Sequence, residues 1–235
     1  LGNDIRSIAR EKAGIIKDGV PLVIGRMRPD AQSVLLETAN RYGAEVHYAG
    51  VAGKTSEDGP HWPENRATAK KALEVLNEMP FGRGWEVPGL DFITKSGHDG
   101  RWQWLKSASS GARILLDCAH NLDGLTRTLG AIQNQDFDML RIVYGAMNDK
   151  DIHGALSLMP RQGTYYFCQT HSPRAFPADE LFNCAGKNGL QGAAFPTVEK
   201  AVLAASSEAE SNDLVLVLGS VFIVGEAITW NRGRE

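Results

Sequence analysis

The chain has 235 residues, of which 43% are hydrophobic and 23% charged, and its formal net charge is −3. This composition is ordinary for a globular protein with a sizeable core, and the absence of a long Lys/Arg run argues against a nucleic-acid-binding surface. No apolar stretch approaches the roughly 20 residues of a membrane-spanning helix. Three widely spaced cysteines, Cys118, Cys168 and Cys184, indicate free thiols in a reducing cytoplasm.

The first fifty residues alternate between helical and strand patterns. Apolar spacing predicts helices over 5–16 and 30–42, and short apolar runs predict strands over 21–25 and 45–49. This α-β-α-β order is typical of the end of a parallel-sheet domain. Because the chain enters helical patterning directly at Leu1, with neither a Met nor a leader, we expect it to be a cut chain.

A glycine-rich loop follows over residues 50–63. Gly50–Ser56 has the spacing G-x-x-G-K-[ST] of a phosphate loop, but the next residues, with Pro60 and Pro63, cannot form the helix that such a loop requires. We therefore do not expect it to bind a nucleotide. A helix is predicted over 64–79, and Asn65 at its start is a capping or first-turn residue.

The stretch from Pro80 to Gly100 is rich in Gly and Pro and is the predicted linker, which gives domains at 1–98 and 99–235. Regular alternation then predicts βαβ units and a mostly parallel, Rossmann-like sheet. The predicted strands are 113–118, 140–146, 164–169, 213–219 and a weaker one at 191–195. The predicted helices are 122–134, 150–158, 177–187, 197–210 and 221–229.

Polar residues crowd the exit of the first of these strands. Asp117, His120 and Asn121 follow the buried run Arg113–Leu116, and helical spacing resumes at once. Capping of the next helix explains one of the three, either Asp117 or Asn121. The other two are left without a structural role. Ligands of open α/β sheets bind at the carboxyl ends of strands, so we expect a ligand site here.

Three later strands end in similar groups. Lys150 belongs to the polar run after the second strand, Ser172 and Arg174 follow the third, and Ser220 follows the last. Helix capping is an equally good explanation for Asp149 alone. Because the carboxyl ends of parallel strands lie at one edge of a sheet, these groups together predict one site.

Two further candidate site residues also have ordinary structural explanations. Lys12 lies within a largely apolar helical stretch, where a lysine usually extends its ammonium group to the surface; a reactive amine would need burial. Arg101 stands beside Trp102 and Trp104, a group that also suits plain aromatic packing between domains, although Arg is the preferred partner of phosphate.

Taken together, these segments resemble the folylpolyglutamate synthase/dihydrofolate synthase family, relatives of the Mur ligases. The resemblance follows family order along nearly the whole chain. Its matching segments are Ile8–Lys17 with Glu-Lys-Ala-Gly-Ile, Gly100–Gln103, Leu116–Asn121 with Asp-Cys-Ala-His-Asn, Tyr144–Asp151, Ser172–Ala175, Gly219–Ser220 and Val224–Glu226.

The resemblance implies an ATP-dependent ligase that adds L-glutamate to dihydropteroate or to a folate polyglutamate through an acyl phosphate. ATP and Mg²⁺ are the implied cofactors, and the fold would be the tail of a P-loop-type ATPase domain followed by the C-terminal glutamate ligase domain. Lys12, as a carbamate, would help to hold Mg²⁺. The other implied roles are nucleotide contacts by Asn65, Arg101, Asp117 and Asn121, catalysis by His120, and substrate contacts by Lys150, Ser172, Arg174 and Ser220.

The chain departs from the family pattern in three ways. The family's phosphate loop and its other Mg²⁺ ligands precede the Glu-Lys-Ala-Gly-Ile segment, so we expect a fragment that is inactive without the N-terminal half of the enzyme. Cys118 and Leu122 stand where Gly and Pro are usual, and the match over Gly50–Ser96 is loose. Two alternatives stay open: a stand-alone α/β ligand-binding module, and a Mur-type ligase for peptidoglycan precursors.

Overall fold

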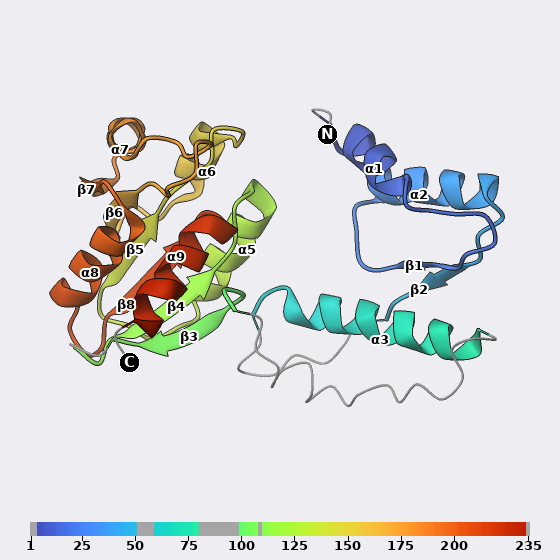
Figure 1. The fold of residues 1–235 in the computed structure, drawn as a ribbon, viewed down its shortest axis with the longest axis horizontal. Coiled ribbons are helices and arrows are strands. Elements are labelled where there is room, and N and C mark those ends of the chain that lie inside the picture. Colours follow the sequence, from blue (N-terminus) through green and yellow to red (C-terminus); the bar gives the residue numbers. More distant parts are fainter. Residues whose placement is uncertain (1–3, 51–58, 80–98, 108–109, 234–235) are drawn as a thin grey trace. The chain divides into compact units, whose positions relative to one another are not determined.

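The computed structural model describes residues 4–50, 59–79, 99–107 and 110–233 (Figure 1). The chain divides into two compact units, Leu1–Ser96 and Gly97–Glu235. The loop Gly50–Ser56 lies almost wholly outside the described residues. Among the helices of the described part, none is both long and apolar enough to cross a bilayer.

The first unit confirms the predicted α-β-α-β order and the long helix predicted after it. It contains α1 (Ile5–Ala13), β1 (Leu22–Ile24), α2 (Pro29–Arg41), β2 (Val46–Tyr48) and α3 (Trp62–Glu78). Strands β1 and β2 are parallel, and α1 packs against α2. A small apolar core joins α1, α2, β1 and β2, formed by Ala13, Ile16, Ala39 and Ala44 with half-buried Leu22, Leu35 and Val46.

Two helix boundaries in this unit differ from the prediction by two residues or more. Helix α1 ends at Ala13 rather than at residue 16, because Gly14 serves as its C-cap. Helix α3 begins at Trp62, two residues early, with His61 as its N-cap and a proline in its first turn. Proline is compatible with the first turn, where its missing N–H would have no helical partner.

The second unit contains a six-stranded sheet in the order β3-β4-β8-β5-β6-β7 (Figure 1). Every pairing is parallel except that of β3 with β4, which confirms the mostly parallel sheet. The central strand β8 is buried at all five positions, as strands covered on both faces are. The strands are β3 (Gln103–Lys106), β4 (Arg113–Asp117), β5 (Leu140–Tyr144), β6 (Thr164–Cys168), β7 (Gln191–Phe195) and β8 (Leu214–Leu218).

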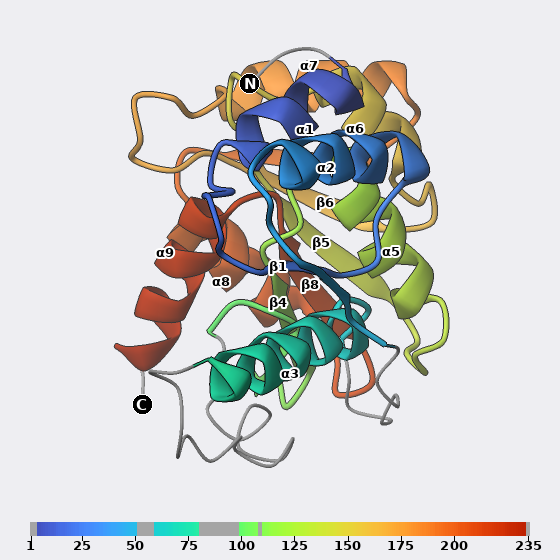
Figure 2. The ribbon, with the colours of Figure 1, turned by 90° about the vertical axis from the view of Figure 1, so that its right-hand side faces the viewer.

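Helices cover both faces of this sheet: in Figure 2, α8 and α9 lie on one side of its strands and α5 on the other. On one face α8 and α9 share a core with alternate residues of β4 and β8, such as Ile114, Leu116, Val215 and Val217. On the other, α5 packs against α6, and α6 against α7. The helices are α5 (Leu122–Ile132), α6 (Ile152–Leu158), α7 (Ala178–Lys187), α8 (Val198–Glu208) and α9 (Val221–Arg232).

Strand β3 was not predicted. Its sequence, Gln-Trp-Leu-Lys, has only one half-buried aliphatic residue and no fully buried position. It is an edge strand that pairs only with β4 among the described strands, so it lacks the long apolar run by which the other strands were found. The antiparallel pairing of β3 brings the turn before it, residues 100–102, to the carboxyl end of β4.

An ion pair between a half-buried arginine and a buried carboxylate lies at the amino end of the sheet. The Asp213 carboxylate accepts hydrogen bonds from the Arg141 guanidinium at 3.0 Å and from the N–H groups of Met139 and Glu210. Burial would lower the pKa of Arg141, but hydrogen bonds from its guanidinium to Tyr166 and Asp213 outweigh burial and raise it. Burial and a hydrogen bond to Glu208 raise the pKa of Tyr166 to about 12.

We expect Asp213→Ala to destabilise the protein by about 3–5 kcal/mol, because it removes the buried partner of the Arg141 guanidinium and the acceptor of two backbone N–H groups. Side-chain exposures of 14% for Arg141 and 3% for Asp213 support this figure. Urea unfolding followed by circular dichroism would measure it. Glu208→Gln is the matched control, since the 57%-exposed Glu208 should contribute less than about 1 kcal/mol. Equal losses in the two variants would contradict the prediction.

Candidate functional site

The carboxyl ends of the central strands lie in register. Asp117 at the end of β4 pairs with Leu218 of β8, and Leu218 pairs with Tyr144 of β5. After β4 the chain enters α5, and after β8 it enters α9, which covers the opposite face from α5. Neighbouring strands whose connections leave to opposite faces open a crevice between them, which is the usual ligand position in open α/β sheets.

Asp117 is buried beneath this edge, with 4% of its surface exposed. Its Oδ2 accepts a hydrogen bond from the Trp102 N–H at 3.0 Å. Its Oδ1 accepts from the Ala119 N–H at 2.9 Å and from the Thr128 hydroxyl at 3.1 Å. The carboxylate therefore joins the turn before β3, the exit of β4 and helix α5, so both of its oxygens are already engaged with the protein.

Arg101 lies in the turn that Asp117 holds. The carbonyl of Gly100 accepts from the Cys118 N–H at 2.9 Å, and Trp102 has a φ of +54°, unusual for a residue with a side chain. Burial raises the pKa of the Cys118 thiol, while the charge of Arg101 opposes that rise and the charge of Asp117 adds to it. Arg101 itself is exposed. The fold thus brings the exposed guanidinium to the strand end where Asp117 lies.

His120 is half-buried, and its Nδ1 lies 2.9 Å from the Cys118 carbonyl oxygen. Because a carbonyl can only accept, Nδ1 carries the proton in this contact, and Nε2 is left as the acceptor of the neutral ring. Asn121 is the N-cap of α5 and accepts from the Gly124 N–H at 2.8 Å. Capping therefore accounts for Asn121, the alternative that its position in the sequence had left open.

The exit of β8 is tightly fitted. The Gly219 N–H donates to the Ala119 carbonyl at 3.0 Å, which ties it to the exit of β4. Gly219 has a φ of +123°, and a Cβ atom on it would lie 1.8 Å from the Gly145 carbonyl oxygen. Ser220 is buried and N-caps α9, its hydroxyl accepting from the Ile223 N–H at 3.1 Å.

The segments after β5 and β6 pair with each other. The Asn148 N–H donates to the Arg174 carbonyl at 2.9 Å, and Met147 forms a bridge with Ala175. Lys150 lies 3.0 Å from Asp149, and this hydrogen bond, with help from the Arg174 charge, lowers the pKa of Asp149. These segments place the cations predicted as substrate contacts at the same sheet edge.

Ser172 and Arg174 lie on the segment after β6. The Ser172 N–H donates to the Thr170 hydroxyl at 2.9 Å. The guanidinium of Arg174 stands 5.9 Å from the centroid of the Phe222 ring, within the range of a cation–π contact. Phe222 was not predicted from the sequence. An exposed aromatic residue at the start of a helix does not by itself indicate a contact with a distant residue.

The two candidates in the first unit have simpler surroundings. Lys12 is exposed near the end of α1, which agrees with an ordinary surface lysine and not with the burial that a reactive amine would need. Asn65 is exposed in the first turn of α3 and is not its N-cap. Among the described residues, no three His, Cys, Asp or Glu side chains form a metal-binding group.

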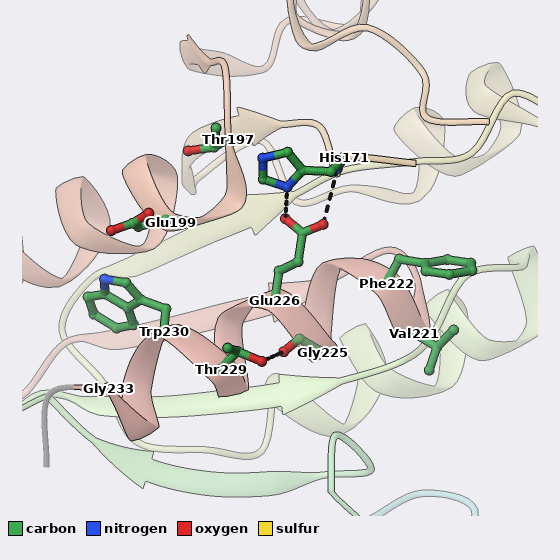
Figure 3. Close-up of a pocket in the computed structure, with 10 residues that line it drawn as sticks. All are labelled: His171, Thr197, Glu199, Val221, Phe222, Gly225, Glu226, Thr229, Trp230 and Gly233. Carbon is green, nitrogen blue, oxygen red and sulfur yellow. Dashed lines mark hydrogen bonds and ion pairs between the residues drawn. The ribbon is translucent and has the colours of Figure 1, made fainter. Parts of the chain in front are cut away.

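A groove of about 630 Å³ runs beside α9 (Figure 3). Glu226 and Trp230 of α9, His171 after β6 and Glu199 of α8 are among its lining residues. Figure 3 shows the Glu226 carboxylate facing His171. Val224–Glu226 was part of the resemblance, but no role had been predicted for Glu226, since its partner lies 55 residues away.

The second unit matches a known family. The model of the Mur ligase glutamate ligase domain matches residues 100–221, just over half of the chain. The chain belongs to this family. The match begins at the turn that carries Arg101 and ends one residue after Ser220, so it contains all the strand-end residues described above.

Curated relatives extend the similarity to almost the whole chain. It is 28% identical to the dihydrofolate synthase/folylpolyglutamate synthase of Bacillus subtilis over 96% of its own length, and 29% identical to that of Escherichia coli over 97%. The chain spans 58% and 56% of the lengths of these two relatives.

Solved structures show the same fold. E. coli FolC in complex with DHPP and ADP superposes with a TM-score of 0.78 at 28% identity, covering 100% of this chain and 58% of that one. The Yersinia pestis folylpolyglutamate synthase/dihydrofolate synthase with AMPPNP and Mn has a TM-score of 0.73 at 26% identity, covering 99% and 58%. The fold expected from the resemblance is confirmed.

Proposed function

We propose that the chain is part of an ATP-dependent ligase that joins L-glutamate to dihydropteroate or to a folate polyglutamate through an acyl phosphate. The observation that carries the proposal is the meeting of Arg101, Asp117 and His120 at one strand end of a Mur ligase glutamate ligase domain. The complexes of the related structures, with DHPP and ADP and with AMPPNP and Mn, support it.

Each strand-end residue receives a role from its surroundings. The exposed Arg101 guanidinium would neutralise phosphate charge. Asp117, with its oxygens engaged, would act by fixing the turn that carries Arg101, in addition to any nucleotide contact. The free Nε2 of His120 would take a proton from the ammonium group of glutamate, which must be neutral to attack the acyl phosphate.

Lys150, Ser172, Arg174 and Ser220 would face the glutamate. Two of them are cations, which suit the two carboxylates of glutamate. Ser220 N-caps α9 through its hydroxyl oxygen, so it would contact the glutamate by donating its O–H. Asn121 caps α5 in the same way and would reach the nucleotide only through its NH₂ group.

Magnesium is the proposed metal. The described residues do not by themselves form a site for it, so no step of the reaction is assigned to a metal held by this chain alone. Lys12 would contribute as a carbamate, whose oxygens suit a hard cation, although α1 by itself does not give its amine the burial that favours the neutral, reactive form. Asn65 would contact the nucleotide from the exposed first turn of α3.

We further propose that these 235 residues alone do not turn over ATP, because Pro60 and Pro63 follow the G-x-x-G-K-[ST] stretch Gly50–Ser56 where a phosphate loop requires a helix. Glutamate-dependent release of ADP from ATP by the purified chain, with dihydropteroate present, would overturn this. The three free cysteines suit a reducing compartment, so the cytoplasm is the proposed location.

The substrate is tested by measuring ADP release in the full-length gene product with dihydropteroate, tetrahydrofolate or a UDP-linked peptide precursor. The proposal expects L-glutamate-dependent ADP release with one or both pteridine substrates and none with the UDP-linked compound. The reverse pattern would indicate a peptidoglycan precursor ligase. Ligand binding with no ADP release under any condition would indicate a binding module.

Arg101→Ala should weaken ATP binding in the full-length gene product by about 10- to 100-fold, the usual range for a lost charge-assisted hydrogen bond. Isothermal titration with ATP would measure the dissociation constant. Arg161→Ala is the control and should leave it unchanged, because Arg161 is exposed and precedes β6, at the opposite end of the strand from Ser172 and Arg174. Unchanged ATP affinity in Arg101→Ala would remove Arg101 from the nucleotide site.

A further inference from the structure

Glu226 on α9 makes two contacts with one residue of the segment that follows β6 (Figure 3). Its Oε1 accepts a hydrogen bond from the backbone N–H of His171 at 3.1 Å. Its Oε2 lies 3.4 Å from Nδ1 of the same residue. The Glu226 side chain is 30% exposed, whereas that of His171 is 81% exposed. The partly buried carboxylate therefore holds an otherwise exposed piece of backbone.

The segment held in this way carries two of the proposed substrate contacts, Ser172 and Arg174. Its far end is held by backbone hydrogen bonds to the segment after β5, from Asn148 to Arg174 and from Phe176 to Ala146. Its near end is held to α9 by Glu226. The segment therefore spans two anchors, one on each side of the residues that would meet the substrate.

Helix α9 supplies a second contact to the same segment. Phe222 lies four residues before Glu226, so the two side chains lie on one face of α9, about one turn apart. The Phe222 ring lies beneath the Arg174 guanidinium, and the Glu226 carboxylate lies against His171. Phe222 and Glu226 of α9 thus contact Arg174 and His171, which lie three residues apart on the segment. These two contacts fix both the position and the direction of the segment.

We propose that Glu226 is a positioning residue that sets the segment 171–174 so that Ser172 and Arg174 meet the carboxylates of the amino-acid substrate. This role rests on the proposed ligase function. Glu226 does not touch the substrate itself. Its effect should therefore fall on the affinity for the amino acid more than on the rate of the chemical step.

The first test measures the anchor itself, by hydrogen–deuterium exchange in the 235-residue chain. Glu226→Ala should speed exchange in peptides covering 169–177 by about tenfold, because the His171 N–H loses its acceptor. Glu226→Gln keeps an acceptor oxygen and should recover part of the protection. Glu199→Ala is the matched control: Glu199 lines the same groove, and within the described residues no hydrogen bond or ion pair joins it to this segment.

The second test measures the effect on the reaction in the full-length gene product. Glu226→Ala should raise KM for L-glutamate about tenfold, with kcat and KM for ATP within about twofold, and Glu226→Gln should lie between it and the parent. Glu199→Ala should match the parent.

Four results would overturn the role of Glu226: unchanged exchange at 169–177, unchanged KM for glutamate, an equal fall in kcat, or the same changes in Glu199→Ala. These outcomes can be told apart from failure of the proposed function. A parent protein that forms no glutamate adduct at all refutes the ligase, and this role with it. An active parent with an unaltered Glu226→Ala variant refutes only the role of Glu226.

Discussion

Gly219→Ala should destabilise the protein by about 3–6 kcal/mol, the largest effect expected of any single methyl group in the strand-end site. A φ of +123° is strained for any residue with a Cβ atom, and that atom would lie 1.8 Å from the carbonyl oxygen of Gly145. The clashing atom belongs to the backbone of the loop after β5, so no side-chain rotation can relieve it. Urea unfolding would measure the loss.

Gly130→Ala is the control for this change. Gly130 lies within α5 with a negative φ, and nothing stands within 4 Å of its missing Cβ atom. Alanine there should be neutral or stabilising by about 0.5–1 kcal/mol, since it favours the helix and limits the unfolded chain. A Gly219→Ala variant as stable as Gly130→Ala would mean that the exits of β5 and β8 are not packed as closely as described.

Asp117→Ala should cost about 3–5 kcal/mol. The change removes the acceptor of three buried donors, on Trp102, Ala119 and Thr128, and each unsatisfied donor costs about 1–3 kcal/mol. Because the turn before β3 depends on this carboxylate, Arg101 should also lose its fixed place. Urea unfolding, together with the nucleotide dissociation constant of the full-length gene product, would measure both effects.

Two variants bracket the Asp117 result. Asp117→Asn keeps one acceptor oxygen but turns an NH₂ group toward a donor, so its loss should be smaller than that of alanine yet still above about 1 kcal/mol. Asp123→Ala removes a 75%-exposed carboxylate that pairs with Arg127 and should cost less than about 0.5 kcal/mol. A loss in Asp117→Ala no larger than in Asp123→Ala would refute the anchoring role.

The sequence was sufficient to predict the mostly parallel sheet and the edge at which its polar residues gather. The strands β4, β5 and β8 are buried apolar runs, and each gives way to small or charged residues at its carboxyl end. In a parallel sheet this pattern has one geometric outcome, since all such ends lie at the same edge. The edge strand β3, being short and half-polar, lacks that signal.

The sequence could not predict which hydrogen-bond partner each polar group has. Asp117, Asn121 and Ser220 were predicted as ligand contacts, and each makes hydrogen bonds to backbone N–H groups. Such bonds depend on the local path of the chain, which composition does not specify. Glu226 and Phe222 escaped prediction for the related reason that their partners, His171 and Arg174, are distant in sequence.

Hydrogen–deuterium exchange of the full-length gene product, with and without ADP and Mg²⁺, tests the nucleotide site at the β4 exit most directly. Bound nucleotide should slow exchange in peptides covering 100–102 and 117–121, and Arg101→Ala should abolish the slowing at the same ADP concentration. Slowing confined to other parts of the chain, such as the amino edge of the sheet around Asp213, would contradict the assignment of this strand end to the nucleotide.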